Sequence, residues 1–523
     1  MEDTAKLPEL PGPAEATTVN EFTKRFVPTE TLPQELGIPK DASNLDVWNI
    51  IELYFRERGL VYHKLEPYDI FLETVKHIIR TTPPILAEDS KSQGVYQYSF
   101  GNVAMIPPVI TPQEARLRNM DYNITVVADI IQGYTVMKTH TQKVFPNVKI
   151  AELPLMLRSR YCKLYQLQPE EMIKMGECDH DVGGYYIING KERCIVAQER
   201  IQYNRVYVWP PQKTSDKKNY KFMAEIRSVL VRGTKPAIAK IFIEKNGNML
   251  CLLSGLKEEI QIGVIIHTLG AMTGWWNIND NSEETIRQLI LGNETDDSEI
   301  NEILDKLLYS SRLGRNQAAI DIIGGSTTSP IPKDQRLEFI TKLFKHESLV
   351  HIPEGMKVVF MAYMIRKLID VFLGRRKIDD RDHFANKRCD TDGCLLEDLF
   401  RGFFNKYLEN VGTKIVSHPN NVSAFERDFT ISQGIHHCMS TGNWGIQKIG
   451  FQKVGVCQLA TRLNYASLLS HLKRVSSNRS VESRSTKLRQ LHGSQWGIID
   501  PAETPEGKNS GILKNLSLAG HIT

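Results

Sequence analysis

The sequence lacks the features that most readily place a chain in a class. No run of apolar residues approaches the ~18 residues of a membrane-spanning helix, and the acidic, proline-rich N-terminus is unlike a signal peptide. The net charge of +4 is too small to indicate a nucleic-acid-binding protein by itself, and no segment repeats along the chain. These absences argue against a membrane protein and against a repeat protein. The function must therefore be inferred from local sequence patterns.

The sequence also lacks a recognisable metal-binding pattern. Its eight cysteines are scattered without a C-x-x-C pair, and the spacing of the nearest two, Cys389 and Cys394, is a poor indication of zinc. We therefore expect free thiols in a reducing compartment. The other candidate, Asp379 to His383, has too many consecutive polar residues for all of them to reach one ion, and no second cluster accompanies it. We expect this chain to bind no metal ion.

Local periodicity predicts a mixture of helices and strands. The length of 523 residues suffices for about two to four domains. Helical spacing is found at Asp46–Phe55, Pro67–Arg80, Leu395–Leu408 and Ile431–Met439, and alternation typical of strands at Tyr96–Phe100 and residues 122–139. The strand Tyr185–Ile188 is followed by Asn189-Gly190, which is typical of a tight hairpin turn. The sequence therefore predicts a multidomain α+β fold of mixed helices and antiparallel sheets.

Residues 206 to 378 have a different pattern, in which predicted strands are followed by predicted helices. Strands are expected at Val206–Trp209, Phe222–Ser228, Ile238–Ile243 and Leu250–Leu253. Met356 to Gly374 predicts an amphipathic helix whose methionines are core residues rather than metal ligands. Asp280 to Lys306 contains nine acidic residues and is interpreted as a solvated outer face.

One segment departs from the mixed charge of the rest. From Gly445 to Gln490, nine basic residues stand against the single acid Glu482, a formal charge of +8, so everything else sums to −4. A solvated face usually mixes both signs, so this segment suggests a polyanionic partner. It leads into residues 489–507, where prolines and glycines exclude a regular helix and predict a rigid, bent connector. Taken alone, a structural loop is an equally good interpretation of the connector.

Two further segments have competing interpretations. Pro112 to Asn119 places two arginines and a glutamate beside apolar residues, which favours an internal ion-pair brace over a phosphate site. Gly183-Gly184 is compatible with a phosphate-binding loop, but no Gly-Lys-Ser/Thr motif and no helical pattern follow it. We therefore reject a phosphate loop at the glycine pair.

The connector and its surroundings resemble a known family. Gln490 to Gly507, Gly511 to Leu518 and Tyr465 to Arg474 are similar to the fork of the second-largest, beta-like subunit of DNA-directed RNA polymerase. The similarity is greatest to the eukaryotic polymerase II type and to its counterparts in large DNA viruses. It runs in the family's order from Pro112 to the C-terminus and is weakest in the arm and between residues 210 and 350.

The resemblance implies the N-terminal half of that subunit, which comprises protrusion, lobe and fork. The implied parts are an extended arm (1–44), the first part of the protrusion (45–205), the lobe (206–388), the second part of the protrusion (389–447) and an incomplete fork (448–523). The mixed charge of Asp379 to His383, close to the implied boundary, then suggests a brace between lobe and protrusion.

The implied activity is transcription by template-directed nucleotidyl transfer, a transferase reaction that uses Mg²⁺. In the family the ions are held by another subunit, so we expect this chain to contribute no catalytic residue and to be inactive alone. Its implied role is to shape the DNA cleft and the fork near the active centre. The implied partners are the largest subunit and other polymerase subunits, the missing C-terminal half of the second subunit, DNA and the RNA–DNA hybrid.

Two other interpretations stay open. One is a free-standing nucleic-acid-binding module that reuses the basic loop, and the other is an inactive truncated remnant. Within the main interpretation the chain is a fragment or a naturally split subunit, and a chain that needs a second half is expected to expose apolar surface and unpaired strand edges near its C-terminus. A cellular copy would work in the nucleus, and a viral copy in a cytoplasmic factory or virion.

Nucleic-acid contacts are expected from basic and polar residues of the fork. They are Lys448, Lys453, Lys473, Arg474, Arg479, Arg484, Lys487, Arg489 and Gln490. By resemblance, Arg489 and Gln490 lie at the rigid base of a loop near the point where downstream DNA strands separate. Lys448 and Lys453 would lie closer to the RNA–DNA hybrid.

The fork loop departs from the family at its tip. Ser476 to Arg479 stands where the family has a proline- and glycine-bearing turn, so the resemblance does not define the contacts of the tip. Near the middle of residues 471–490 only Val475 and Val481 are apolar, too few to anchor a core. We expect the centre to be mobile, and a solvated linker is the alternative interpretation.

Overall fold

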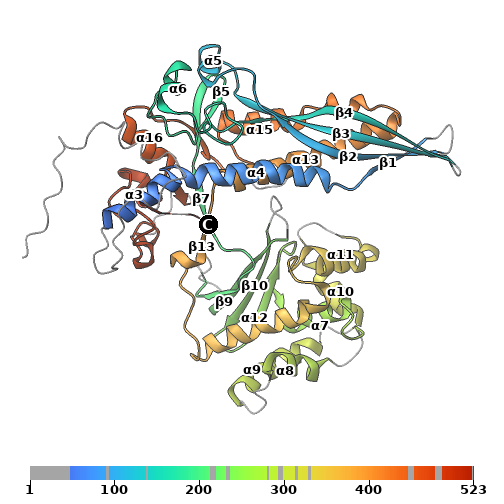
Figure 1. Cartoon of the computed structure of the whole chain (residues 1–523). Coiled ribbons are helices and arrows are strands. Elements are labelled where there is room, and N and C mark those ends of the chain that lie inside the picture. The colour runs from blue at the N-terminus through green and yellow to red at the C-terminus, as the bar shows by residue number, and fades with distance from the viewer. Residues whose placement is uncertain are drawn as a thin grey trace, which may run out of the picture. The chain divides into compact units, whose positions relative to one another are not determined.

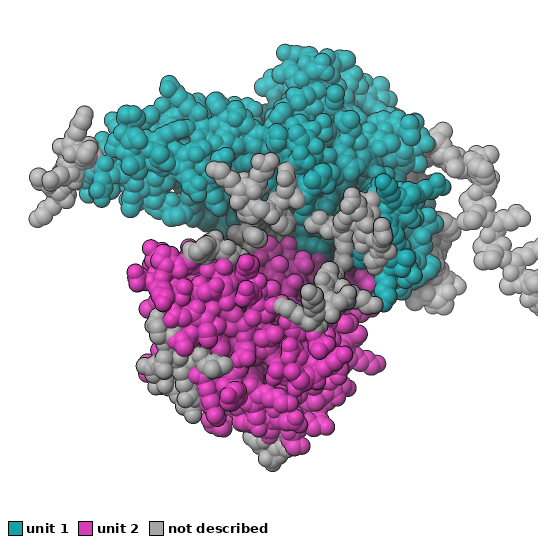
Figure 2. All heavy atoms as spheres, turned by 180° about the vertical axis from the view of Figure 1, so that it is seen from behind, with its two compact units in different colours: residues 1–200, 389–523 teal, residues 201–388 magenta. Residues whose placement is uncertain are grey.

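The structure, a computed structural model, divides into two compact units. It describes residues 47–89, 94–136, 139–211, 219–230, 236–278, 282–292, 298–312, 316–327, 331–445, 453–477, 486–520 and 522. The first unit contains residues 1–200 and 389–523, and the second contains residues 201–388 (Figure 2). The second unit coincides closely with the predicted lobe, although the domain names stay predictions. The predicted arm lies outside the described residues.

The first unit contains a four-stranded antiparallel sheet packed against helices (Figure 1). The strands, in sheet order, are β1 (Ile85–Asp89), β2 (Gly94–Ile106), β3 (Asn123–Val136) and β4 (Thr139–Pro154). The helices that contact them are α4 (Tyr62–Arg80), α13 (Asp392–Ser417), α14 (Ser423–Glu426) and α15 (Thr430–Thr441). One continuous apolar core joins these elements, and the strands and helices predicted here are confirmed.

The start of α4 was predicted wrongly. Proline favours the first turn of a helix, so the pattern placed the start at Pro67, whereas α4 begins at Tyr62 with Pro67 inside it. Tertiary packing overrides this preference, because the ammonium of Lys64 pairs with Asp392 at 2.8 Å with both side chains almost fully buried. Gly393 permits this close approach, since a Cβ there would lie within 3.0 Å of the Pro67 carbonyl oxygen.

A small sheet contributes to the same core of the first unit. It contains β5 (Tyr186–Ile188), β6 (Lys191–Ile195) and β14 (Cys457–Leu459), in the order β14-β6-β5. The turn between β5 and β6 places Asn189 at φ 51° and Gly190 at φ 70°, the left-handed region that this two-residue turn requires. The hairpin predicted from Asn189-Gly190 is therefore confirmed.

The second unit packs helices around a five-stranded antiparallel sheet (Figure 1). The strands are β8 (Tyr207–Trp209), β9 (Tyr220–Ser228), β10 (Ala237–Glu244), β11 (Met249–Leu253) and β12 (Ile260–Gln261). The helices are α7 (Ile262–Met272), α8 (Glu283–Leu291), α9 (Ser298–Arg312), α10 (Asn316–Gly325), α11 (Arg336–Lys342) and α12 (Lys357–Phe372). All four strands predicted between residues 206 and 253 are confirmed.

Two predictions for the helices of the second unit are also confirmed. Met361 and Met364 of α12 are buried in the core, as expected for methionines on an amphipathic helix. The acidic segment forms α8 and α9, which bury apolar residues such as Ile286 and Leu304, while acids such as Glu302 remain exposed. The fold is thus α+β, as predicted. Within the described ranges, no helix is long and apolar enough to cross a membrane.

Candidate nucleic-acid interface

The fork segment begins with a short helix and a buried strand. Helix α16 (Tyr465–Leu472) starts at Asn464, whose side chain accepts a hydrogen bond from the backbone N–H of Ser467 at 2.7 Å. Strand β15 (Arg474–Ser477) follows at once and pairs in parallel with β7 (Ala197–Ile201) and antiparallel with β16 (Leu513–Asn515). The fourth strand is β13 (Lys387–Asp390), and the order of this sheet is β13-β7-β15-β16, so β16 is an outer strand.

Strand β15 contradicts the expectation that this stretch has too few apolar residues to be anchored. Val475 is 1% exposed, because the two partner strands flank it. A single β-branched residue is enough here, since the partners that bury it come from distant parts of the sequence. Residues 478–485, which include Val481 and the predicted mobile centre, lie outside the described residues.

The connector predicted at residues 489–507 extends in the structure to residues 486–512, which bend and contain no α-helix. It contains the short 3₁₀ turns η7 (Thr486–Leu488), η8 (Gly493–Gln495) and η9 (Gly507–Asn509). The hydroxyl of Thr504 accepts from the backbone N–H of Gly511 at 2.9 Å and donates to the carbonyl of Leu513 at 3.1 Å. The backbone N–H of Asp500 bonds the carbonyl of Asn515 at 2.8 Å, which ties the connector to β16. The prediction that this stretch cannot be a regular helix is confirmed.

Arg489 helps to hold the connector in shape. Its Nη1 donates to the carbonyl oxygens of Lys508 at 2.6 Å and of Ser510 at 2.9 Å. Gly511 adopts φ 70°, and a Cβ there would lie within 3.0 Å of the Arg489 backbone. The guanidinium therefore links the start of the connector to the backbone near its end. Replacement of Arg489 would change the conformation of the connector.

Lys453 and Lys473, two of the predicted contacts, are buried. Lys473 is 5% exposed, and its ammonium donates to the carbonyl oxygens of Ser517 at 3.3 Å and Leu518 at 3.0 Å. Its burial lowers its pKa from 10.5 to about 8. Lys453 is 7% exposed, and burial lowers its pKa despite the opposing effect of Asp390. Both ammonium groups therefore lie inside the first unit rather than on its surface.

The other predicted contacts occupy three kinds of environment. Arg474 is partly buried, and its Nε is enclosed with no hydrogen-bond partner among the described residues. Lys487 and Gln490 are exposed at the start of the connector, on either side of the anchored Arg489. Lys448, Arg479 and Arg484 lie outside the described residues. Among the predicted contacts that the structure describes, Lys487 and Gln490 are thus the two exposed side chains.

The predicted ion-pair brace near Pro112 is confirmed and is larger than expected. Arg116 of α5 (Pro112–Leu117) donates from Nη1 to Glu177 at 2.8 Å and from Nε to Glu192 at 2.8 Å. Arg462 donates to the same Glu192 at 2.5 Å and to Asp181 at 3.2 Å. Arg462 belongs to the basic segment of the sequence, so part of that +8 charge is compensated by acids from elsewhere in the chain.

The segment from Asp379 to His383 braces elements inside the second unit. The carboxylate of Asp379 accepts from the backbone N–H of Val208 at 2.8 Å and pairs with the ammonium of Lys367 at 3.4 Å. Asp380 is exposed and accepts from the backbone N–H of Asp382 at 2.9 Å. Among the described residues, no three His, Cys, Asp or Glu side chains are grouped as metal ligands would be.

Exposed apolar surface is expected near the C-terminus of a chain that needs a second half, but the sequence did not indicate which residues would form it; the structure shows such residues in and after the connector. Trp496 is 64% exposed, and Leu491, Ile498 and Leu518 are also exposed. They are dispersed among glycine and polar residues, so no periodicity marks them in the sequence. Large exposed apolar side chains such as these are typical of a surface that another polypeptide covers.

Comparison with known proteins identifies the family. The family model for "RNA polymerase beta subunit" matches residues 59–436, and that for "RNA polymerase Rpb2, domain 3" matches residues 458–522. The chain is 33% identical to DNA-directed RNA polymerase II subunit 2 of Arabidopsis thaliana, with 92% of this chain and 44% of the relative covered. It is 33% identical to the polymerase II subunit RPB2 of Encephalitozoon cuniculi, with 91% of this chain and 43% of the relative covered.

A shorter relative is covered almost completely. The chain is 30% identical to DNA-directed RNA polymerase subunit Rpo2N of Methanococcus vannielii, with 91% of this chain and 95% of the relative covered. The chain thus spans less than half of the two eukaryotic relatives and nearly all of the archaeal one. The fork-like connector, the α+β fold and these matches over most of the sequence show that the chain belongs to the family of the second-largest, beta subunits of DNA-directed RNA polymerases.

Proposed function

We propose that this chain acts as the N-terminal part of the second-largest subunit of a multisubunit DNA-directed RNA polymerase. In that assembly it shapes the DNA cleft and the fork for template-directed RNA synthesis, a nucleotidyl transfer. The family matches at residues 59–436 and 458–522 support this role. The coverage of relatives named as polymerase II subunit 2 and Rpo2N supports it independently.

The observation that carries the nucleic-acid part of the proposal is the anchoring of the connector. Arg489 and Thr504 fix the connector by side-chain hydrogen bonds to its own backbone and to β16, while Lys487 and Gln490 stay exposed at its start. Because the backbone beneath these side chains is already ordered, binding a phosphate costs only the ordering of the side chains themselves. We propose that Lys487 and Gln490 contact the nucleic-acid backbone near the fork.

Mg²⁺ would supply the charge stabilisation that nucleotidyl transfer requires. The described residues do not fit a site for it, since they contain no suitable group of three ligands. We therefore propose that the catalytic ions are held by another subunit of the polymerase, and no catalytic step is assigned to this chain.

The exposed apolar residues support binding of this surface to another polypeptide. Leu491, Trp496, Ile498 and Leu518 lie in and after the connector and are exposed. We propose that another part of the polymerase covers this surface, such as the C-terminal half of the second subunit or the largest subunit. The same observation argues against a free-standing module, because such a module would leave these side chains in water.

A salt titration tests the proposed nucleic-acid contact. Binding of forked DNA is measured by fluorescence anisotropy for the wild type and for Lys487→Ala at several salt concentrations. Loss of one phosphate contact should reduce the slope of log affinity against log salt by about 0.7–0.9. The affinity should fall to a similar extent for DNA of different sequences, since a phosphate contact carries no sequence information.

A matched lysine provides the control. Lys406 is exposed on α13 of the same unit, so Lys406→Ala removes the same charge away from the connector and should leave the slope unchanged. Arg489 is not used, because its loss would alter the connector itself. An identical slope for wild type and Lys487→Ala would show that Lys487 makes no phosphate contact.

A further inference from the structure

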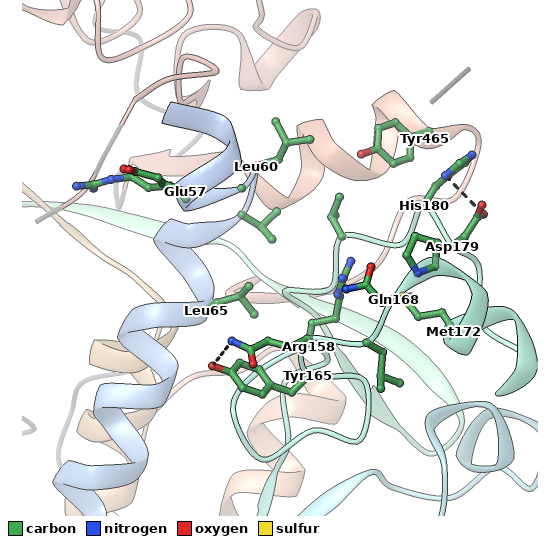
Figure 3. Close-up of a pocket in the computed structure, with 17 residues that line it drawn as sticks. Glu57, Leu60, Leu65, Arg158, Tyr165, Gln168, Met172, Asp179, His180 and Tyr465 are labelled. Atoms are coloured by element: carbon green, nitrogen blue, oxygen red, sulfur yellow. Dashed lines mark hydrogen bonds and ion pairs between the residues drawn. The ribbon is translucent and has the colours of Figure 1, made fainter. Parts of the chain in front are cut away.

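The first unit contains a pocket that the proposed polymerase role does not use. Its volume is about 600 Å³, which lies within the range of small-molecule sites. The lining comes from the end of α3 (Val47–Arg58), the start of α4, the loop after β4, α6 (Pro169–Lys174), the loop after α6 and the first residue of α16. Figure 3 shows Arg158, Gln168 and His180 among the side chains that line it.

Arg158 is held in the pocket by an unusual backbone conformation. It adopts φ 64°, in the left-handed region that a residue with a long side chain rarely occupies. Gly183 makes room for it, since a Cβ on Gly183 would lie within 3.0 Å of the Arg158 side chain. Residues in strained backbone conformations occur most often at ligand-binding and active sites, so the conformation of Arg158 is consistent with a binding role.

The guanidinium of Arg158 is only partly compensated. Its Nη1 donates to the backbone carbonyl of Asp181 at 2.6 Å, and no ion pair involves it among the described residues. The carboxylate of Asp181 is engaged elsewhere, by the backbone N–H of Gly183, the hydroxyl of Tyr185 and the guanidinium of Arg462. Burial lowers the pKa of Arg158, although the nearby Asp181 opposes this effect. The other N–H groups of Arg158 are therefore available to a ligand.

The remaining lining defines the chemistry of that ligand. Aliphatic walls are formed by Leu60, Val61, Leu65, Leu167, Met172 and Val182. Two arginines, Arg58 and Arg158, are balanced by Glu57 and Asp179, so the formal charge of the lining is zero when His180 is neutral. A lining of this charge suits a single negative charge better than a dianion such as a phosphate monoester.

We propose that this pocket binds the carboxylate of a ligand that carries an apolar group, with Arg158 forming a charge-assisted hydrogen-bonded pair with the carboxylate. The fork of the guanidinium matches the two oxygens of a carboxylate, and the apolar group contacts Leu65 and Met172. This inference is independent of the polymerase role, because none of the residues proposed to contact nucleic acid lines the pocket.

The test uses phenylacetate as the probe on the full chain. The ε-methyl group of Met172 is observed by NMR in protein with ¹³C-labelled methionine methyls, and its resonance is assigned by Met172→Leu. Titration with phenylacetate should shift the Met172 resonance saturably and leave that of Met105, in β2, unchanged. Benzyl alcohol, which lacks the carboxylate, should bind about tenfold more weakly or worse, since it loses the charged hydrogen bond.

A variant assigns the effect to Arg158. Arg158→Asn removes the cation, and asparagine tolerates the left-handed backbone well, so this variant should remain folded. It should bind phenylacetate about tenfold more weakly or worse. The control Arg160→Asn removes an exposed arginine two positions away and should bind as the wild type does.

Three outcomes would overturn the proposal. The first is a wild type in which phenylacetate leaves the Met172 resonance unchanged. The second is equal binding of phenylacetate and benzyl alcohol, which needs no variant and would show that the carboxylate is not recognised. The third is tighter binding of phenyl phosphate than of phenylacetate, which would show that the pocket selects a dianion.

Discussion

The protonation of His471 tests how the fork helix α16 is held in place. His471 is 2% exposed. Its Nδ1 accepts from the backbone N–H of Thr461 at 3.2 Å, so the proton of the neutral ring lies on Nε2 and is donated to Gln458 Oε1 at 3.1 Å. Burial lowers the pKa of His471 from 6.5 to about 4, and the charges of Arg474 and Lys64 act in the same direction.

The size of the effect follows from this pKa difference. Below pH 6.5 the imidazole is protonated in the unfolded chain, whereas in the folded chain it stays neutral until about pH 4. The unfolded state therefore binds more protons, and stability falls as the pH decreases through this window. At 1.36 kcal/mol per pKa unit, His471 accounts for a loss of about 2 kcal/mol in the free energy of unfolding between pH 7 and pH 5.

Urea unfolding at pH 7 and pH 5 measures this loss. At pH 7, His471→Leu should be less stable than the wild type by about 1–2 kcal/mol, because two hydrogen bonds are lost. At pH 5 the difference should shrink by about 2 kcal/mol, since the leucine variant has no imidazole to protonate. His418 is exposed at the end of α13, so His418→Leu should keep the pH dependence of the wild type. Equal pH dependence in the wild type and His471→Leu would refute the reasoning.

Four substitutions test the packing within each of the two units by thermal unfolding. Gly393→Ala should lower stability by about 1–3 kcal/mol or more, because its Cβ would collide with the carbonyl of Pro67; a neutral effect would contradict the close approach of α13 to α4. Asp379→Ala should lower the free energy of unfolding by about 1.5–3 kcal/mol. Replacement of the exposed Asp380 by alanine should lower it by less than about 1 kcal/mol. The reverse order would contradict the brace formed by Asp379. Lys357→Met should lower the free energy of unfolding by about 2 kcal/mol, because the buried ammonium donates hydrogen bonds to three backbone carbonyls. An unchanged midpoint of thermal unfolding would contradict this role.

Much of the fold could be predicted because its signals are local. Asn189-Gly190 specifies its turn through two backbone conformations, and the strands of the second unit alternate or run apolar over short stretches. The methionines of α12 follow a helical period and are buried as predicted. The motifs of the connector were also readable, since a stretch rich in proline and glycine excludes a regular helix.

The parts that could not be predicted depend on contacts between distant residues. Arg462 appeared to add to a one-sided positive charge, but Glu192, 270 positions away, neutralises it. Lys473 looked like an exposed basic residue, but carbonyls of Ser517 and Leu518 enclose its ammonium. Val475 alone could not indicate a strand, because the strands that bury it are far away in the sequence. A charge count along a sequence therefore overestimates the charge that reaches the surface.

Purification of the tagged chain from its native source tests most directly whether it works in an RNA polymerase. The copurified proteins are identified by mass spectrometry, and template-dependent incorporation of labelled nucleotides is measured for the complex and for the isolated chain. We expect the complex to contain the largest polymerase subunit and to synthesise RNA, and the isolated chain to synthesise none. RNA synthesis by the isolated chain, or a purified chain accompanied by no polymerase subunit, would contradict the assignment.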